Sequence, residues 1–212
     1  MANIIAVIFD MDGVLIDARA WHFQALKVAL AEHGFDLDDD YHEARLDGLP
    51  TQSKLEILKK EFALKESLFD SINRHKQKLT IEIAKKLCRP EQDKKQLLTF
   101  LQHRGLRLGL CSNAKMSSIN LFMKLANLSQ HFDFMLSCEQ VSHPKPSPDL
   151  YIKGMEILGS KPENTLIVED SEFGYNAAIG AGAHVLRVSG PDDVNIGYLT
   201  HSYPDLGAGI KP

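Results

Sequence analysis

The sequence predicts an α/β protein in which a doubly wound, mostly parallel sheet is interrupted by an all-helical insertion. Three observations lead to this fold class. An apolar run at residues 4–9 has the pattern of a buried strand, residues 17–87 show helical spacing without a convincing strand, and helical and strand patterns alternate after Pro90. Strands that alternate with helices are joined by right-handed crossovers, which place them parallel in one sheet.

The first strand pattern, I-I-A-V-I-F at residues 4–9, contains no polar residue. It is too short to span a membrane and too apolar for a strand with one face in water, so we expect a buried parallel strand. Asp10 follows directly and Asp12 two residues later, at the edge of an α/β sheet where ligands bind. Paired carboxylates there favour a site for a hard divalent cation such as Mg²⁺, although D-x-D-G also occurs as a simple turn.

The insertion carries three helical patterns, and as many as four helices are expected in it. The patterns cover residues 21–33, 52–62 and 65–86. Gly34 is a natural stop for the first pattern, the acidic segment 36–40 is expected to form a turn, and Thr51 is expected to be the N-cap of the second helix.

Helices and strands then alternate to the end of the sheet. Helices are expected at residues 92–103, 117–128, 150–158 and 174–181. Strands are expected at residues 106–110, 132–136, 165–168 and 184–188. The tail from Pro191 is weakly patterned, and no element is predicted there.

Composition and net charge indicate which partners and which cellular location to expect. The net charge of −4 argues against nucleic acid as a partner, because broad phosphate binding needs a basic surface. The three cysteines lack metal or disulfide spacing and favour a reducing compartment, so we expect a cytoplasmic protein. The N-terminus lacks the features of a signal peptide and no apolar run is long enough to span a membrane, so no membrane partner is expected. We expect a monomer.

Polar side chains gather where four predicted strands or their following loops end. These residues are Asp10 and Asp12, Ser112 and Asn113, Lys145, and Glu169 and Asp170. Each group alone is a weak signal. Their convergence on the carboxyl edge of one parallel sheet predicts a site for a metal ion and a phosphate group.

These groups resemble the four motifs of the haloacid dehalogenase superfamily of phosphohydrolases. The matching segments are D-M-D-G-V-L-I-D at residues 10–17, Ser112-Asn113, Lys145 within P-K-P-S-P-D, and E-D-S-E-F-G at residues 169–174. The chain is most similar in pattern to β-phosphoglucomutase-like enzymes and sugar-phosphate phosphatases. The resemblance implies a Rossmann-like catalytic core domain of residues 1–16 and 88–212 and a helical cap domain of residues 17–87.

The resemblance implies that Asp10 is the nucleophile. A carboxylate can accept a phosphoryl group as an acyl phosphate and so divide one difficult displacement into two easier steps. Asp12 is the expected general acid–base, which protonates the leaving alkoxide and then activates water, and its backbone carbonyl is expected to bind the metal. The competing interpretations are a metal ligand only for Asp10 and a turn residue for Asp12.

Three further residues are expected to bind the phosphoryl group. Lys145 should offset its charge, although most lysines in loops are simply exposed. Ser112 and Asn113 should donate hydrogen bonds to its oxygens, or they could cap the following helix.

Four acidic residues form the predicted Mg²⁺ site. They are Asp10, Asp12, Glu169 and Asp170. Asp170 is the better candidate for a direct ligand, while Glu169 could act through water. The competing interpretation for Glu169 and Asp170 is a carboxylate that caps the next helix.

The cap offers weaker candidates for substrate binding, namely His22, Gly48 and Thr51. His22 stands twelve residues after Asp10, where β-phosphoglucomutases carry a histidine, but it could equally be a packing residue. Thr51 stands where the mutase pattern expects an arginine for a second phosphate, and a threonine cannot supply that charged fork. The basic residues 74–76 could bind an anionic substrate, although a solvated helix face is the favoured interpretation.

We therefore expect a Mg²⁺-dependent phosphatase, a phosphoric monoester hydrolase that acts on a small phosphorylated metabolite such as a sugar phosphate. The first alternative is a β-phosphoglucomutase-like phosphohexomutase, in which the same aspartyl-phosphate returns its phosphoryl group to a sugar. The second alternative is a non-catalytic binding protein on the same fold, because fold alone does not establish activity.

Overall fold

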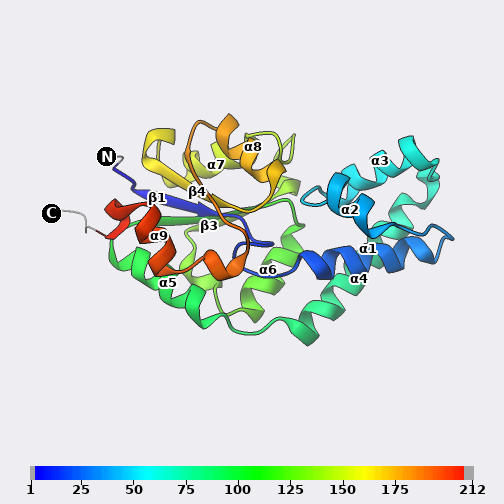
Figure 1. Cartoon of the computed structure of the whole chain (residues 1–212), viewed down its shortest axis with the longest axis horizontal. Helices are drawn as coiled ribbons and strands as arrows, with labels where there is room; N and C mark the ends of the chain where they lie inside the picture. The colour runs from blue at the N-terminus through cyan, green and yellow to red at the C-terminus, as the bar shows by residue number, and fades with distance from the viewer. Residues whose placement is uncertain (1–2, 208–212) are drawn as a thin grey trace. The chain divides into compact units, whose positions relative to one another are not determined.

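The computed structural model describes residues 3–207 (Figure 1). The chain forms two compact units, one of Met1–Asp17 and Arg89–Pro212 and the other of Ala18–Cys88. The first unit is built on a sheet, whereas the described secondary structure of the second unit consists of helices only. The predicted fold class, a Rossmann-like α/β sheet with an all-helical insertion, is therefore confirmed.

One parallel sheet forms the centre of the first unit. Its strands are β1 (Ala6–Phe9), β2 (Arg107–Ser112), β3 (Phe134–Ser137), β4 (Thr165–Glu169) and β5 (His184–Arg187). The strand order is β3-β2-β1-β4-β5, and each neighbouring pair is parallel. β1 is buried along its whole length between β2 and β4, which explains why its sequence is apolar on both faces. The carboxyl ends of these three strands therefore meet at one edge of the sheet.

Strand β3 begins at Phe134, two residues later than the sequence pattern predicts. The backbone N–H of Leu108 donates to the Asp133 Oδ2 at 2.8 Å, and the backbone N–H of Asp133 donates to the Leu108 carbonyl at 2.8 Å. A side-chain oxygen thus takes the place of a strand carbonyl, and the regular register begins with Gly109 opposite Phe134.

Helices cover both faces of this sheet. They are α5 (Gln92–His103), α6 (Met116–Leu125), α7 (Asp149–Leu158), α8 (Glu172–Gly180) and α9 (Ile196–Ser202). Short 3₁₀ helices lie at Ser129–His131, Cys138–Gln140, Pro162–Asn164, Pro191–Asp193 and Pro204–Gly207. In Figure 1, α7 and α8 lie on one face and α5 and α9 on the other, which is the doubly wound arrangement.

One helix end and one additional helix differ from the sequence prediction. Helix α6 ends at Leu125 rather than near residue 128, because Asn127 has a φ of 59° in the left-handed region and cannot continue a helix. Helix α9 forms in the tail, where no element was predicted, and Asn195 caps it by accepting a hydrogen bond from the Tyr198 N–H at 2.9 Å.

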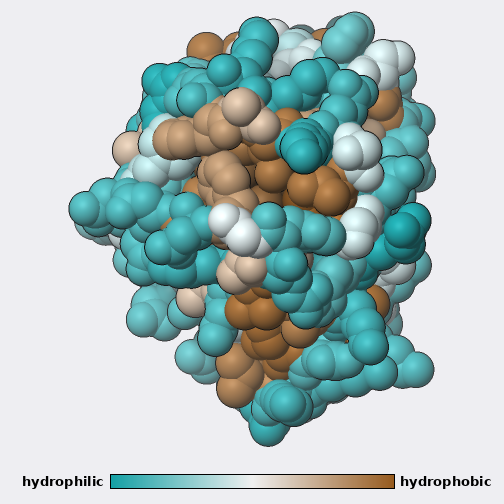
Figure 2. Space-filling model, turned by 90° about the vertical axis from the view of Figure 1, so that its right-hand side faces the viewer, coloured by the Kyte–Doolittle hydropathy of each residue, from teal (hydrophilic) through white to brown (hydrophobic). Residues whose placement is uncertain are grey.

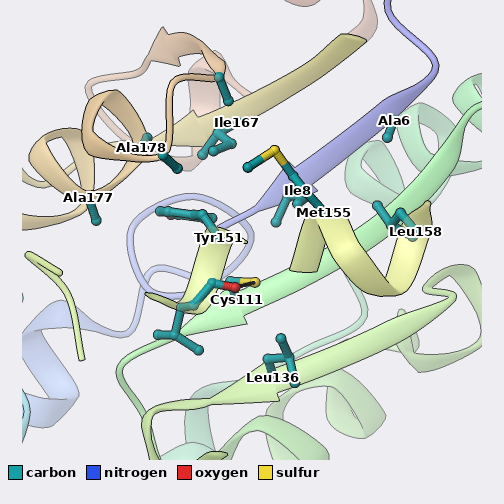
Figure 3. Close-up of a cluster of buried hydrophobic side chains, with 13 residues drawn as sticks. Ala6, Ile8, Cys111, Leu136, Tyr151, Met155, Leu158, Ile167, Ala177 and Ala178 are labelled. Carbon is teal, nitrogen blue, oxygen red and sulfur yellow. Dashed lines mark hydrogen bonds between the residues drawn. The ribbon is translucent and has the colours of Figure 1, made fainter. Parts of the chain in front are cut away.

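A hydrophobic cluster joins the sheet to α7 and α8 (Figure 3). Ile8 of β1 and Ile167 of β4 pack with Tyr151 and Met155 of α7 and with Ala178 of α8. Each fully buried large apolar side chain contributes about 1.5–3 kcal/mol relative to exposure. This packing holds α7 against the sheet, and with it the loop that precedes α7.

The second unit contains four α-helices among its described residues. They are α1 (Arg19–Ala31), α2 (Asp39–Arg45), α3 (Thr51–Phe62) and α4 (Phe69–Leu87), with a 3₁₀ helix at Glu66–Leu68. The side chains that form its hydrophobic core are Leu26, Ala29, Leu30, Leu37, Leu46, Leu55, Leu58, Leu64, Phe69 and Ile72.

The starts of two helices in this unit differ from the sequence prediction. Residues 36–40 do not form only a turn, because the Asp38 side chain accepts a hydrogen bond from the Tyr41 N–H at 2.8 Å and starts α2. Thr51 is the first residue of α3 rather than its N-cap, a position that Pro50 occupies without a side-chain hydrogen bond. Proline suits the start of a helix because its φ is already close to helical.

Hydrophilic side chains cover most of the face of the molecule shown in Figure 2. Between them, hydrophobic side chains gather in contiguous patches. Within the described residues, no helix has both the length and the apolar character that a membrane span requires.

The helical unit also buries a histidine next to a lysine. The Lys54 Nζ lies 3.1 Å from the His42 Nε2, and the two residues are only 6% and 5% exposed. Burial, followed by the positive charge of Lys54, lowers the pKa of His42 to about 4, although the charges of Asp47 and Asp39 act in the opposite direction. Lys76 adds a smaller effect that also lowers it. His42 is therefore neutral at pH 7 and can accept a hydrogen bond from the ammonium group.

We predict that the helical unit loses stability as the pH falls from about 6.5 to about 4. Over this range the unfolded state binds a proton at His42 that the folded state does not bind, and the free energy of unfolding should fall by about 3 kcal/mol. Urea unfolding followed by the fluorescence of Trp21, the single tryptophan of the chain, reports on this unit.

His42→Gln keeps an acceptor for Lys54 but cannot titrate, so its unfolding free energy should depend less on pH than that of the wild type. The matched control is His103→Gln at an exposed position of α5, which should leave the wild-type pH dependence unchanged. Equal pH dependence in His42→Gln and the wild type would contradict the assignment.

Candidate active site

The carboxyl edge of the sheet brings together the polar residues that the sequence singles out. Asp10 directly follows β1, Ser112 is the last residue of β2, and Glu169 is the last residue of β4. Because β1 lies between β2 and β4, Asp10 occupies the middle of this edge. The backbone N–H of Asp10 donates to the Val168 carbonyl at 3.0 Å, which extends the ladder and fixes the start of the loop.

The loop after β1 turns back at once. Gly13 has a φ of 88°, in a region that glycine adopts without steric cost, and its N–H donates to the Ile16 carbonyl at 2.7 Å. Asp12, half-buried, lies immediately before this turn. The backbone conformation of this turn therefore requires the glycine of D-M-D-G. The turn directly follows the two acidic residues at the end of the buried strand.

Lys145 is the central cation of the site. Its side chain is 2% exposed, and its Nζ donates to the Asp10 Oδ1 at 2.6 Å, the Glu169 Oε1 at 2.6 Å and the Cys111 carbonyl at 2.8 Å. An ammonium group has three donors, so these contacts use all of them. The interpretation of Lys145 as an ordinary exposed loop lysine is therefore wrong.

Burial and the neighbouring charges act in opposite directions on this lysine. Burial lowers the pKa of Lys145, but the negative charges of Asp10 and Glu169 together outweigh burial and leave the pKa above the usual lysine value. Lys145 therefore stays positively charged at neutral pH.

The acidic groups outnumber this one cation. Burial, as the largest effect, raises the pKa of Asp10, Lys145 lowers it, and the charges of Glu169, Asp170 and Asp12 raise it further, so the pKa lies well above the usual aspartate value. One carboxylate oxygen from each of Asp10, Glu169 and Asp170 lies within 4.8 Å of the other two. An all-oxygen cluster with excess negative charge fits Mg²⁺, which would also favour the ionised form of Asp10.

Glu169 has no exposed surface, and its carboxylate accepts hydrogen bonds from five donors. Its Oε1 accepts hydrogen bonds from the Lys145 Nζ at 2.6 Å and from the Tyr151 hydroxyl at 2.5 Å. Its Oε2 accepts from the backbone N–H groups of Asp170 and Ser171 at 3.1 and 3.3 Å, and from the Ser171 hydroxyl at 3.3 Å. Glu169 therefore binds Lys145 directly, in addition to lying in the carboxylate cluster.

Gly174 makes room for this carboxylate. A Cβ atom at Gly174 would lie 1.9 Å from the Glu169 Oε1 and 2.0 Å from its Cδ, far closer than atoms can approach. The glycine that ends the segment E-D-S-E-F-G is thus explained by the close approach of α8 to a buried side chain.

Asn113 and Ser112 make contacts that differ from their simplest predicted roles. The Asn113 Nδ2 donates to the Lys145 carbonyl at 3.1 Å, and the Lys145 N–H donates to the Asn113 Oδ1 at 3.0 Å. This reciprocal pair fixes the backbone of Lys145. The buried Ser112 Oγ accepts a hydrogen bond from the Ala114 N–H at 3.0 Å, which leaves its own hydroxyl hydrogen able to donate.

Comparison with known proteins agrees with this geometry. A family model of haloacid dehalogenase-like hydrolases matches residues 7–188, which is most of the chain. The chain belongs to this family. The predicted resemblance is thereby confirmed, and so is the prediction that the protein is a hydrolase.

Relatives of the chain include proteins named as phosphatases and a protein named as a phosphoglucomutase. The chain is 31% identical over 178 residues to the phosphorylated carbohydrates phosphatase of Thermotoga maritima, covering 84% of this chain and 81% of the relative. It is 28% identical over 191 residues to the beta-phosphoglucomutase of Bacillus subtilis, covering 86% and 82%. Its fold is similar to the crystal structure of a beta-phosphoglucomutase from Clostridium difficile, with a TM-score of 0.80, 22% identity, and coverage of 97% and 99%.

The remaining predicted residues, His22, Gly48 and Thr51, lie in the helical unit. The His22 Nδ1 lies 2.9 Å from the Lys76 Nζ, and Lys76 is 9% exposed. The interpretation of residues 74–76 as a solvated helix face is therefore wrong for Lys76, which is buried. The roles of His22, Gly48 and Thr51 toward a substrate stay predictions.

Two participants in this site were not found from the sequence. The Cys111 carbonyl binds Lys145, a role that a backbone oxygen does not reveal in a sequence. Tyr151 lies at an apolar position of a helical pattern and was counted only as part of it. The hydroxyl of a buried tyrosine usually has a hydrogen-bond partner. A tyrosine at a buried position of this helix therefore indicated a polar contact in the core.

We predict that Gly174→Ala destabilises the protein by about 1–3 kcal/mol, because the new methyl group must displace the buried Glu169 carboxylate. Urea unfolding measures the change. The matched control is Gly180→Ala in the same helix, where the new Cβ would lie no closer than 3.5 Å to Pro148. This control should stay within about 1 kcal/mol of the wild type, and equal stability of the two variants would contradict the close contact at Gly174.

Proposed function

We propose that the protein is a Mg²⁺-dependent phosphatase that hydrolyses a small phosphorylated metabolite of the sugar-phosphate class. The observation that carries the proposal is the fixed contact between the buried Lys145 ammonium and Asp10, beside a cluster of three carboxylates. A carboxylate nucleophile, a cation and a metal-binding cluster within one small region are what phosphoryl transfer requires. The name of the Thermotoga maritima relative supports the substrate class.

In the proposed mechanism Asp10 attacks phosphorus and forms an aspartyl-phosphate, while the leaving alkoxide departs. Asp12 donates a proton to that alkoxide and then accepts one from the water that hydrolyses the intermediate. Lys145 offsets negative charge on the phosphoryl oxygens, and the Ser112 hydroxyl donates a hydrogen bond to one of them. Asp10, Asp170 and the backbone carbonyl of Asp12 would hold Mg²⁺, with Glu169 acting through water, and the bound ion would supply positive charge that reduces the repulsion between the carboxylates and the phosphate dianion.

Electrostatics explain why these groups must act together. A phosphate dianion that approaches an ionised Asp10 meets a region already rich in negative charge. One lysine cannot balance several carboxylates and a dianion, so a divalent cation is needed for both binding and attack. The same cation would keep Asp10 ionised and therefore nucleophilic.

The second candidate function is a phosphohexomutase, which the name of the Bacillus subtilis relative supports. Against it stands Thr51, at the first position of α3, where the mutase pattern expects an arginine for a second phosphate. A threonine lacks the charge and the bidentate geometry that hold a phosphate. We therefore favour transfer of the phosphoryl group to water. The helical unit is proposed to act as the substrate-selecting cap.

We predict that Asp10→Asn lowers phosphate release by roughly 10³-fold or more while the protein stays folded, because the amide has the same shape but is not a nucleophile. Phosphate release and circular dichroism measure the two effects. The matched control is Asp40→Asn at an exposed position of α2, which should retain wild-type activity. Wild-type turnover by Asp10→Asn would contradict the nucleophile assignment.

We also predict that a panel of sugar phosphates yields free phosphate in the presence of Mg²⁺ and none after the metal is removed with EDTA, with activity restored when Mg²⁺ is added back. The same reactions are assayed for isomerised sugar phosphate. Isomerisation without phosphate release, stimulated by a sugar bisphosphate, would contradict the phosphatase and establish the mutase. Turnover that persists in EDTA would contradict the role of the metal.

A further inference from the structure

The hydroxyl of Tyr151 reaches the centre of the charged network from the hydrophobic core. Tyr151 lies in α7 and is fully buried among the residues of the cluster in Figure 3, where its side chain lies near Cys111 and Ile8. Its hydroxyl donates to the Glu169 Oε1 at 2.5 Å. A phenylalanine would fill the same apolar space, so packing alone does not account for the hydroxyl.

Tyr151 contacts both members of the ion pair. Its hydroxyl binds Glu169, and the Lys145 Nζ lies 4.7 Å from the centre of its ring, within the range of a cation–π interaction. The hydroxyl and the ammonium group share one acceptor atom, the Glu169 Oε1. Tyr151 can therefore influence the relative strength of the two contacts that the Lys145 ammonium makes, one with Glu169 and one with Asp10.

We propose that Tyr151 is a positioning residue, whose hydroxyl holds Glu169 and limits its pull on Lys145 so that the ammonium group stays on Asp10. The proposal rests on the phosphatase function proposed above. Nothing in it requires Tyr151 to touch the substrate.

The physical reason is competition between two carboxylates for one cation. Each lies 2.6 Å from the Lys145 Nζ, so neither dominates by distance. A hydroxyl donor satisfies part of the negative charge on the Glu169 Oε1, which weakens its attraction for Lys145. The Tyr151 hydroxyl lies 2.5 Å from this oxygen and donates a short hydrogen bond to it.

Removal of the hydroxyl should shift the ammonium group toward Glu169. The Oε1 would lose one of its two donors, and Lys145 would compensate by closer contact with it. Lys145 would then lie farther from the place where it must offset charge during transfer from Asp10. The effect should appear in kcat, because this interaction is needed most in the transition state.

The test is Tyr151→Phe, which keeps the ring and its packing and removes only the hydroxyl. Phosphate release from the best substrate of the panel should show kcat reduced about tenfold, with KM changed by less than about threefold. The matched control is Tyr203→Phe in the same unit, whose hydroxyl donates to the Val185 carbonyl at 3.4 Å. This control should leave kcat unchanged.

A double-mutant cycle with Glu169→Gln separates positioning from general loss of stability. If Tyr151 acts through Glu169, then Tyr151→Phe should cost much less in the Glu169→Gln background than in the wild type. The same cycle, read by urea unfolding in EDTA, should show coupling between the two residues without reference to activity. A wild type without phosphatase activity would overturn the proposed function itself. With an active wild type, an unchanged kcat in Tyr151→Phe, or equal losses in both backgrounds, would overturn the role of Tyr151.

Discussion

The rest of the site depends on one interaction, the buried ion pair of Lys145 with Asp10 and Glu169. A charged group can stay buried only when opposite charges and hydrogen bonds replace the water that it loses. Lys145 meets this condition with all three of its donors engaged. Two other features keep it in place. Asn113, which directly follows β2, binds the backbone of Lys145, and α7 packs on the sheet next to it. Gly174 leaves room for the partner carboxylate.

This arrangement explains how reactive charged side chains can lie at the edge of a hydrophobic sheet. The apolar strands β1 and β4 supply rigidity, and the charged groups begin only at the last residue of β4 and just after β1. Side chains on such a frame keep a fixed geometry, which phosphoryl transfer needs because it depends on positioning and electrostatics. The excess of negative charge there also links catalysis to a cation. The helical unit has its own core, so it can vary in sequence without disturbing this frame.

The sequence was enough to predict the sheet, the helical insertion and the residues at the carboxyl edge. Buried parallel strands leave a strong apolar signal, and the four motifs each follow one of them. Contacts between residues that are distant in the sequence could not be predicted in this way. Three such contacts join residues more than fifteen positions apart. They are the ion pair of Lys145 with Asp10, the hydrogen bond between Asn113 and the Lys145 backbone, and the hydrogen bond from Tyr151 to Glu169. The prediction was also wrong where a capping residue resembled a turn residue. Asp38 was expected in a turn, but it is the N-cap of α2.

The most direct test of the account is to identify the residue that carries the phosphoryl group during turnover. The enzyme would be mixed with an isotopically labelled sugar phosphate and Mg²⁺, quenched in acid within milliseconds, and digested for mass spectrometry. The account predicts a phosphoryl adduct on Asp10 that hydroxylamine removes, as expected for an acyl phosphate. An adduct on another residue, or turnover without any covalent adduct at any quench time, would contradict it.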